Sequence, residues 1–436
     1  MGTDGAHPHG GSDAPLELIV IGAGAAGLWA AARAAELGCE VLVLEKTPRT
    51  GTKVLASGGT RCNLTTTLGP VEAARLFGPA GERFLRGAFR ALSPARLRER
   101  FAALGVPTVE EPLEKVFPAS HRARDVRDAL ECWARGAGAR ILCDSAVRGF
   151  ERSHDAWRVR LQDGRVLRTR KLCVCPGGMS YPRTGTTGDG YGWLAALGLP
   201  LIEPVPALVP LVSPEPWVRE LAGVSLQEVH VELRSPDGAL LAQRERPVVF
   251  THKGISGPGA MDLSEPVARE EARAKQSGRD PRAHALRLDL APTLERESLR
   301  ALLASLAGRP GAPMLASSLA TELALPRRLV ARGLAQAGLA PGARVNELAR
   351  AARHSLVEAL KGLAIPVTGT LGFDQAEVTA GGLALAAVDA ATLRVKGIEG
   401  LWVFGEILDL AGPIGGLNFQ AAFSAAELAA RDVSRA

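Results

Sequence analysis

Aromatic residues are scarce in this sequence of 436 residues, where they make up 4% of the chain and include 2 tyrosines. A surface that binds single-stranded nucleic acid by stacking bases on aromatic rings is therefore not expected. Cysteine is sparse too: the 6 cysteines form neither a CxxC pair nor a His/Cys cluster with zinc spacing, so no metal site is predicted. In a chain of this length we expect reduced thiols, which fits a cytoplasmic protein.

Long apolar runs and clustered charges are also missing. The first apolar stretch, residues 16–37, is interrupted by glycines and by Glu17, Arg33 and Glu36, so a membrane span is not expected. Residues 1–13 are polar and glycine-rich, which predicts a disordered tail rather than a secretory signal. The net charge of +6 comes mainly from arginines spread along the chain, a distribution that favours small anionic ligands over a nucleic-acid partner.

What the sequence does contain is a globular composition, with 46% hydrophobic and 22% charged residues. Its length predicts two or three domains. Residues 16–21 and 40–44 are apolar runs typical of buried strands, and 25–37 between them has the pattern of a helix. This βαβ unit begins the fold, and further helices are expected near 82–104 and 122–135.

The remaining chain changes pattern several times. Residues 140–175 alternate with a period of two and predict a β-meander whose last strand, 172–175, returns to the central sheet. Residues 205–290 predict an antiparallel β domain, and 293–362, rich in alanine, leucine and arginine, predict a small helical domain. The other expected elements are strands at 365–371 and 401–404 and a final helix at 418–433.

The glycine motif after the first strand carries the strongest functional signal. Gly22 permits a tight turn, Gly24 lets a pyrophosphate approach the backbone, and Gly27 lets helix and strand pack closely. Glu45, at the end of the second strand, is placed to accept hydrogen bonds from a ribose. Together they predict a dinucleotide site. The polar loop 51–63 favours FAD over NAD, because it is long enough to wrap an extended cofactor.

Two segments supply further candidate flavin contacts. In the polar loop, Lys53 and Arg61 are candidates for phosphate binding. Near the C-terminus, the carboxylate of Glu406 is a candidate ligand of the ribityl hydroxyls, and Gly416 allows the backbone to approach the isoalloxazine ring. The helix that begins there would favour negative charge on the reduced ring, by about 0.3–1 kcal/mol.

Candidate catalytic residues are few. His252 is the histidine best suited to an acid or a proton relay, because its ordinary pKa matches that work. Tyr181 is a second candidate, and both residues equally fit a turn with a structural role. Cys62 has no neighbouring cysteine, and Cys173 and Cys175 share one face of an apolar strand. We therefore expect structural rather than redox-active thiols.

Several motifs in order identify a family resemblance. They include GAGAAGL at 22–28, SGGTRCN at 57–63, PGGMSYPRTGTTGDGY at 176–191 and FGEILDLAGPIGGLNFQ at 404–420. From residue 16 onward the chain resembles the BaiN/YhiN-like family of FAD-dependent flavoproteins, whose members include a 3-dehydro-bile-acid reductase and an aminoacetone oxidase. Two positions depart from the family pattern: Thr60 replaces a usual glycine, and Leu417 replaces a tyrosine.

The resemblance implies an α/β fold with three domains. An FAD domain of the two-dinucleotide-binding, Rossmann-like type would comprise 14–200 and 373–436. An inserted antiparallel β domain would comprise 201–292 and 363–372, and a small helical domain 293–362. The predicted FAD-binding residues are Gly22, Gly24, Ala25, Ala26, Gly27, Glu45, Lys46, Lys53, Ser57, Gly58, Arg61, Asn63, Val147, Gly177, Gly405, Glu406, Gly416, Asn418 and Phe419.

These features predict an FAD-dependent oxidoreductase. In the first interpretation, hydride passes through the flavin from NAD(P)H to a small unsaturated organic substrate. No second strand–GxGxxG–helix unit is present in the sequence, so NAD(P)H would bind only transiently. The alternatives are a flavin oxidase that uses O2 on a small amine and an FAD-bound, RNA-associated protein. The sequence predicts no oligomeric state.

Overall fold

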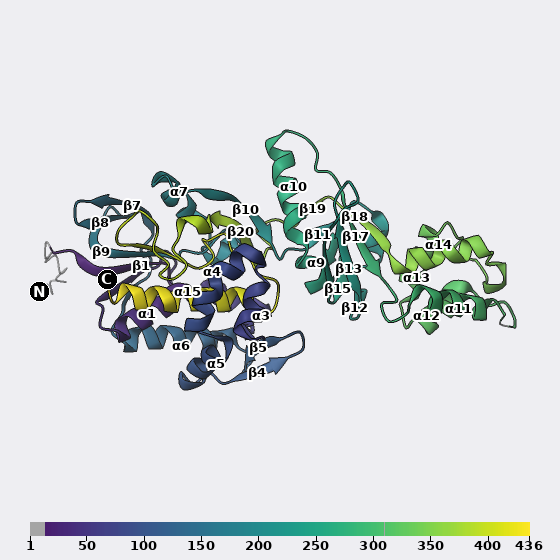
Figure 1. The fold of residues 1–436 in the computed structure, drawn as a ribbon, viewed down its shortest axis with the longest axis horizontal. Coiled ribbons are helices and arrows are strands. Elements are labelled where there is room, and N and C mark those ends of the chain that lie inside the picture. The colour runs from purple at the N-terminus through teal and green to yellow at the C-terminus, as the bar shows by residue number, and fades with distance from the viewer. Residues whose placement is uncertain (1–13, 309) are drawn as a thin grey trace, which may run out of the picture. The chain divides into compact units, whose positions relative to one another are not determined.

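The chain forms two compact units in a computed structural model that describes residues 14–308 and 310–436. The first unit joins the chain up to Pro204 with Gly381–Ala436, and the second is Val205–Ala380 (Figure 1). The chain leaves the first unit through β10 (Leu201–Ala207) and returns through β20 (Val378–Leu383). The three-domain division stays a prediction, and the predicted tail 1–13 lies outside the described residues.

A parallel sheet organises the first unit. β1 (Leu16–Ile21) lies between β2 (Val41–Leu44) and β9 (Val166–Val174), and β6 (Arg140–Leu142) pairs with the outer edge of β2. β21 (Leu401–Val403) pairs with β9 in parallel on the edge opposite β1. The central strands β1, β2 and β21 are short and largely buried, as expected where both faces of a sheet are covered, and the parallel sheet confirms the predicted α/β fold class.

The strand β9 has different partners along one edge. Its first half pairs antiparallel with β8 (Ala156–Leu161), which in turn pairs with β7 (Val147–Ser153). Its second half, from Leu172 to Val174, pairs with β21. The last strand of the predicted meander and its return to the central sheet are thus one continuous strand, β9, which changes partner between Thr169 and Leu172.

Two helices from opposite ends of the chain pack together against this sheet. Figure 1 shows α1 (Ala25–Glu36, purple) beside α15 (Leu417–Val433, yellow), and the two are in extensive contact. Their polar anchor is Glu427, only 4% exposed, which accepts a hydrogen bond of 2.9 Å from the indole N–H of Trp29. Arg33 of α1 pairs with the same carboxylate at 3.2 Å. A buried charge is retained here because it is paired and hydrogen-bonded.

The helix expected near 82–104 is two helices, α4 (Gly78–Ala91) and α5 (Pro94–Ala103). Ser93 caps α5 by accepting a hydrogen bond from the backbone N–H of Arg96, and Pro94 occupies its first turn. A serine cap followed by proline is typical of the first turn of a helix. The chain therefore starts a new helix, α5, here instead of continuing α4. The other elements of this unit include α6 (Ala123–Gly136), α7 (Asp189–Ala196), β3 (Thr65–Thr66), β4 (Thr108–Glu111) and β5 (Lys115–Pro118).

The second unit contains two antiparallel sheets and a group of helices. One sheet has the order β12–β15–β16–β11–β19 and the other β14–β13–β17–β18. The strand expected at 365–371 is in fact two, because the chain passes from one sheet to the other after Val367. The strands are β11 (Leu211–Val212), β12 (Ser225–Leu226), β13 (His230–Arg234), β14 (Leu240–Glu245), β15 (Val248–Phe250), β16 (Gly254–Ser256), β17 (His284–Asp289), β18 (Leu363–Val367) and β19 (Gly369–Thr370).

Helices in the region 293–362 follow the predicted pattern. Their apolar faces, with Leu299, Leu319, Leu334 and Leu356, join the core of the second unit. The alternation of β13 and β17 places Val231, Leu233, Leu286 and Leu288 in the same core and leaves a polar face on the other side of the sheet. The helices are α11 (Arg296–Ala307), α12 (Leu315–Glu322), α13 (Arg327–Gln336) and α14 (Arg350–Lys361).

The contact between α1 and α15 generates a stability prediction. Glu427→Ala leaves the buried indole N–H of Trp29 without an acceptor, so we expect a loss of about 1–3 kcal/mol in the free energy of unfolding. Urea unfolding followed by tryptophan fluorescence measures it. The control is Glu297→Ala, which removes an exposed ion pair to Arg300 and should cost under about 0.5 kcal/mol. Equal effects of the two substitutions would contradict the buried role of Glu427.

Candidate functional site

The candidate site lies at the carboxyl edge of the parallel sheet, where four strands end side by side. Gly22 follows β1, Glu45 follows β2, Gly177 comes shortly after β9, and Glu406 follows β21 closely. In open α/β sheets ligands bind at this edge. The pairing of β9 with β1 and β21 therefore brings motifs from both ends of the chain together.

The three glycines of the first turn meet different surroundings. A Cβ on Gly22, where φ is +104°, would lie 2.6 Å from the carbonyl oxygen of Cys175. A Cβ on Gly27 would lie 1.8 Å from the carbonyl oxygen of Gly22, so only glycine lets α1 approach the turn this closely. Gly24 differs, because no atom of the residues compared in the described chain would lie within 4 Å of its Cβ. The space over Gly24 at the start of α1 is what a pyrophosphate would need.

Glu45 is held beside this turn by hydrogen bonds from the protein. The backbone N–H of Ala23 donates to Oε2 at 2.8 Å, and the backbone N–H and hydroxyl of Thr47 donate to Oε1 at 2.9 and 2.8 Å. A carboxylate has about four lone-pair sites, so these three contacts orient Glu45 and leave about one, on Oε2, for a ribose hydroxyl. The next residue, Lys46, forms an ion pair of 2.6 Å with Asp189 at the start of α7.

The polar loop expected at 51–63 contains a short helix, α2 (Thr52–Ala56), and a single 3-10 turn at Ser57–Thr60. The prediction of a plain loop is wrong because Gly51 adopts a left-handed conformation, with φ of +60°, that starts the helix, and Val54 is buried beneath it. This short helix positions Lys53 toward the C-terminal motif.

The end of this segment explains one departure from the family pattern. Gly58, Gly59 and Thr60 follow one another with φ of +54°, +65° and +69°. Glycine adopts this left-handed region freely, whereas a β-branched residue there costs about 1–3 kcal/mol. A glycine is therefore favoured at position 60 by backbone geometry, and the threonine in this chain carries strain next to the candidate site.

A three-residue polar cluster joins three of the predicted motifs. The Lys53 ammonium forms an ion pair of 2.5 Å with Glu406, and the hydroxyl of Ser180 donates to the same carboxylate at 2.7 Å. The side chains of Lys53 and Glu406 are 22% and 21% exposed, so they lie at the surface of the site rather than inside the core. Sequence reasoning missed Ser180, because its motif gives no sign that the hydroxyl faces Glu406.

The C-terminal glycines place α15 close to the first half of the chain. Gly416 has a φ of +78°, and a Cβ there would lie 2.1 Å from the carbonyl oxygen of Thr65. Asn418 fixes the preceding loop, because its side-chain amide accepts from the N–H of Gly412 and donates to its carbonyl, both at 2.8 Å. Leu417, where the family has a tyrosine, is 1% exposed and belongs to the core.

Other predicted cofactor residues have structural partners. Arg61 pairs with Glu111 at 2.7 Å and lies 4.1 Å from the ring centre of Phe117. Ser57 donates to the carbonyl oxygen of Val54, and Asn63 accepts from the backbone N–H of Val116. Their roles in cofactor binding stay predictions.

The remaining predicted positions are backbone or apolar sites. A Cβ on Gly405 would lie 3.3 Å from the Cβ of Ala26, so the end of β21 touches the first turn of α1. Gly177 has a φ of +86°, Val147 begins β7 with its side chain buried, and Phe419 stacks on Phe423. Ala25 is the first residue of α1, and Gly58 lies in the left-handed segment described above.

The two candidate catalytic residues belong to different units. His252 is exposed in the turn between β15 and β16 of the second unit. Tyr181 lies in the first unit, with φ of +53°, directly before the 3-10 turn Pro182–Thr184. Their catalytic roles stay predictions. The buried phenol of Tyr191 was not singled out from the sequence; its hydroxyl has no hydrogen-bond partner among the described residues, and burial raises its pKa.

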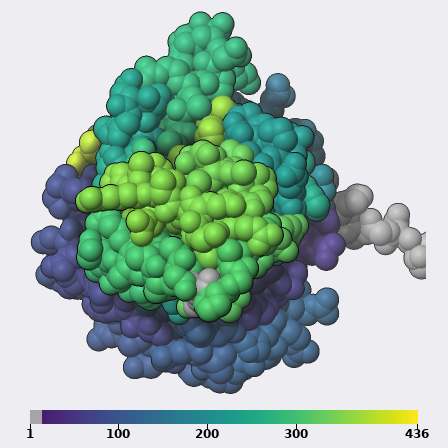
Figure 2. Space-filling model, turned by 90° about the vertical axis from the view of Figure 1, so that its right-hand side faces the viewer, coloured from purple at the N-terminus to yellow at the C-terminus, as the bar shows by residue number. Residues whose placement is uncertain are grey.

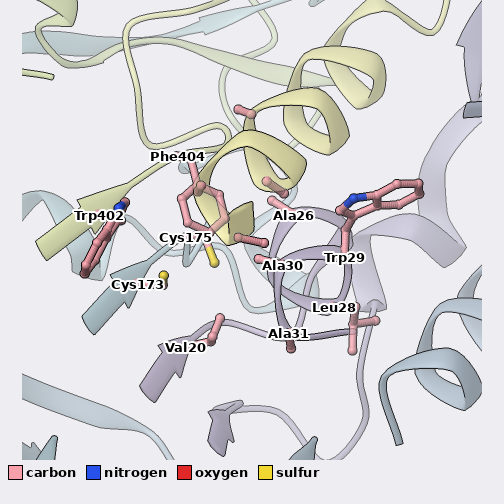
Figure 3. Close-up of a cluster of buried hydrophobic side chains, with 14 of the residues drawn as sticks. Val20, Ala26, Leu28, Trp29, Ala30, Ala31, Cys173, Cys175, Trp402 and Phe404 are labelled. Carbon is pink, nitrogen blue, oxygen red and sulfur yellow. The ribbon is translucent and has the colours of Figure 1, made fainter. Parts of the chain in front are cut away.

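The buried cysteines have the character of structural thiols. Burial raises the pKa of Cys62 to about 12 and raises the pKa values of Cys173 and Cys175. Figure 3 shows Cys175 among the packed side chains of Ala26, Ala30 and Phe404. A neutral thiol is a poor nucleophile, so none of these three is suited to redox exchange.

Taken together, these residues fit FAD. The open space at Gly24 suits the pyrophosphate, the Glu45 carboxylate suits a ribose, and Lys53, Ser180 and Glu406 supply polar groups where the C-terminal motif meets the first turn. Within the described parts of the chain, no helix combines the length and apolarity that a membrane crossing requires. Nor do these parts contain a group of three or more His, Cys, Asp or Glu arranged to hold a metal ion.

Comparisons with known proteins agree with this site. The family described as HI0933-like protein Rossmann domain matches residues 16–432. The chain is 30% identical over 426 residues to a ribosomal RNA dihydrouridine synthase of Haemophilus influenzae, covering 96% of this chain and 98% of that protein. It is 29% identical over 415 residues to a 3-dehydro-bile acid delta(4,6)-reductase of Clostridium scindens, covering 94% and 97%.

A solved structure shows the same fold. The 3-ketosteroid-delta4-(5alpha)-dehydrogenase of Rhodococcus jostii, in complex with 4-androstene-3,17-dione, matches with a TM-score of 0.52 at 16% identity and covers 98% of each chain. Fold and site thus define an FAD-dependent oxidoreductase with a Rossmann-like cofactor domain. The chain belongs to the HI0933-like Rossmann domain family, which confirms the resemblance seen in its motifs.

The open space at Gly24 gives the first test of the cofactor site. Gly24 has φ of −78° and no atom near a Cβ, so Gly24→Val fits the protein alone but places a branched side chain where the pyrophosphate would lie. We expect a folded protein that loses its yellow colour, measured as FAD released per chain on denaturation. The matched control is Gly69→Val, another extended helix cap with no atom near a Cβ. Full FAD occupancy in Gly24→Val contradicts this placement.

The raised pKa of Cys62 gives the second test. With a pKa of about 12 the thiol stays neutral at pH 8.5, so iodoacetamide should label the exposed Cys132 and leave Cys62 unmodified in the folded protein. Mass spectrometry of the labelled peptides measures this. Cys62→Ser should keep the rate of flavin reduction within about tenfold, a barrier change of ~1.4 kcal/mol. A thousandfold loss, or a charge-transfer band that vanishes in Cys62→Ser, would show that the thiol is redox-active.

Proposed function

We propose that this protein is an NAD(P)H-dependent reductase of a carbon–carbon double bond conjugated to a carbonyl group. The observation that carries the proposal is the FAD-fitting site at the carboxyl edge of the sheet, in a chain that spans two relatives almost completely. One relative is named for dihydrouridine formation and the other for reduction at delta(4,6) positions. Conversion of uridine to dihydrouridine and reduction of a conjugated enone both saturate a double bond next to a carbonyl.

The overall reaction balances without another oxidant. NAD(P)H loses a hydride and becomes NAD(P)+, the carbon β to the carbonyl receives the hydride equivalent, and the α carbon receives a proton from water. When bound, FAD supplies the redox chemistry that carries the two electrons between donor and acceptor. Because the sequence has no second dinucleotide motif, NAD(P)H would bind transiently, and ping-pong kinetics are expected.

The chain's own residues would bind and orient the cofactor. The start of α1 and Lys53 favour negative phosphate charge, and Glu45 and Glu406 accept hydrogen bonds from hydroxyl groups. The start of α15 after Gly416 would favour negative charge on the reduced flavin by about 0.3–1 kcal/mol. Since ~1.4 kcal/mol corresponds to about 30 mV for two electrons, this helix would adjust the potential slightly rather than determine it.

A uridine of ribosomal RNA is the second candidate substrate. It is favoured by the name of the Haemophilus relative, which matches this chain over nearly its full length. A small unsaturated molecule is favoured by the Clostridium relative. The flavin oxidase of a small amine remains the alternative that the same experiment tests.

The cytoplasmic location that we propose rests on the six free cysteines, which suit a reducing compartment.

The test is anaerobic stopped-flow measurement of the flavin absorbance in the purified, FAD-loaded protein. We expect NADH or NADPH to bleach the flavin, and either a cyclic enone or in vitro transcribed ribosomal RNA to restore its colour before O2 is admitted. The saturated ketone of the same ring is the matched control and should restore nothing. If NAD(P)H leaves the flavin oxidised while an amine reduces it and O2 then reoxidises it rapidly, the protein is an oxidase and the proposal is wrong.

A further inference from the structure

A polar cavity of about 270 Å³ lies within the second unit, and none of the residues that line it was assigned to FAD. Its floor is the polar face of the sheet, with His230, Glu232 and Arg234 from β13 and Arg287 and Asp289 from β17. Helices α11 and α14 complete it through a few further charged side chains. These are Arg296 of α11 and Glu358 and Lys361 of α14.

The charges around the cavity do not cancel. Three cations have carboxylate partners: Arg234 with Glu232, Arg296 with Glu358, and Lys361 with Asp289, at 2.7, 3.0 and 2.5 Å. Among the residues that the structure describes, the Arg287 side chain makes no ion pair or hydrogen bond. The buried Nε2 of His230 is also without a hydrogen-bond partner. The cavity thus offers one uncompensated guanidinium, a group that suits a phosphate, whereas the His230 nitrogen is enclosed by protein.

A polar stripe that ends in one cation unpaired within the described residues, Arg350, leads from the cavity along α14. Residues 350, 354, 358 and 361 are three or four positions apart and so share one face of the helix. The stripe runs from Lys361 and Glu358 at the cavity to His354 and Arg350, about 16 Å away at 1.5 Å per residue. Arg350 is exposed and its side chain has no partner within the described chain. Figure 2 shows α14 (lime green) on the face toward the viewer, next to the earlier residues of the helical region (green).

The wider helical region is strongly basic and lacks aromatic rings. Residues 293–362 contain ten lysines and arginines against five acidic residues, whereas the whole chain has a net charge of +6. They contain no Phe, Tyr or Trp. This region therefore has a net charge of +5 and cannot stack bases, which suits contacts with a phosphate backbone rather than with bases.

We propose that the cavity and the α14 stripe form a docking surface for the phosphate backbone of structured RNA. The proposal rests on the second candidate substrate above, and it assigns the recognition of that RNA to the second unit rather than to the flavin site. The lysines and arginines are spread along the chain as expected, and what distinguishes residues 293–362 is that they contain only five acidic residues against ten basic ones. One phosphate would occupy the cavity at Arg287, and the next ones would follow the stripe toward Arg350.

The experiment compares two double variants of the full-length, FAD-loaded protein. Arg287→Gln/Arg350→Gln removes two unpartnered cations of the surface. Arg90→Gln/Arg140→Gln is the matched control, because both arginines are exposed in the first unit and form no ion pair or side-chain hydrogen bond with the described residues. Filter binding to in vitro transcribed ribosomal RNA is measured from 0.05 to 0.5 M KCl, about the range over which phosphate contacts weaken.

We expect the surface variant to bind about tenfold more weakly at 0.1 M KCl and to lower the slope of log Kd against log [KCl] by about 1.4–1.8, because each lost phosphate contact removes about 0.7–0.9. The control should stay within about twofold of the wild type. Equal binding by both variants overturns the proposal, as does binding that salt does not weaken. Tighter binding to phosphatidylserine vesicles than to RNA also overturns it, because it would identify a lipid surface.

The experiment distinguishes an error in the proposed docking surface from an error in the proposed reaction. Both double variants should retain the FAD content of the wild type and its rate of flavin reoxidation by a cyclic enone, because neither pair belongs to the residues assigned to FAD. If the enone reoxidises the flavin but RNA does not bind, the docking surface is wrong and the reductase remains. If neither enone nor bound RNA reoxidises the flavin, the reductase is wrong whatever the RNA affinity.

Discussion

The parallel pairing of β9 with both β1 and β21 is the contact on which the candidate site depends. It places residues from the beginning, the middle and the end of the chain at one edge of a sheet, within reach of the same ligand. The close approach of α1 at Gly27 and the packing of α15 against α1 then fix that edge from one side. These strand pairings are what bring Glu45, Ser180 and Glu406 to the same edge of the sheet.

The parts of this arrangement that depend on local sequence were predictable. The βαβ unit follows from two apolar runs, a helical pattern and glycines whose spacing meets a steric requirement, and the helix after Gly416 follows from its apolar period. The family match over residues 16–432 confirms the FAD-type fold that these motifs indicate. The backbone at Thr60 is left-handed, and glycine adopts that conformation freely. This geometry explains why glycine is usual at this position in the family.

The parts that depend on contacts between distant residues were not predictable. Nothing in the sequence around Lys53 or Ser180 indicates that both face Glu406, which is more than 200 residues away from each. The short helix after Gly51 was missed because a single buried side chain, Val54, anchors it. The passage of the chain from one sheet to the other after Val367 was not predicted. An alternation of apolar residues indicates which face of a strand is buried, but it does not indicate which strand pairs with it.

The interruption of the cofactor unit by Val205–Ala380 has a consequence for biosynthesis. As the ribosome extends the chain, the inserted unit is complete before β21 and α15 have been made, because those elements belong to the last 36 residues. The inserted unit therefore has the opportunity to fold first, while β9 still has an open edge where β21 will pair. That edge of β9 stays open until β21 has been synthesised, so the candidate cofactor site cannot be complete before then.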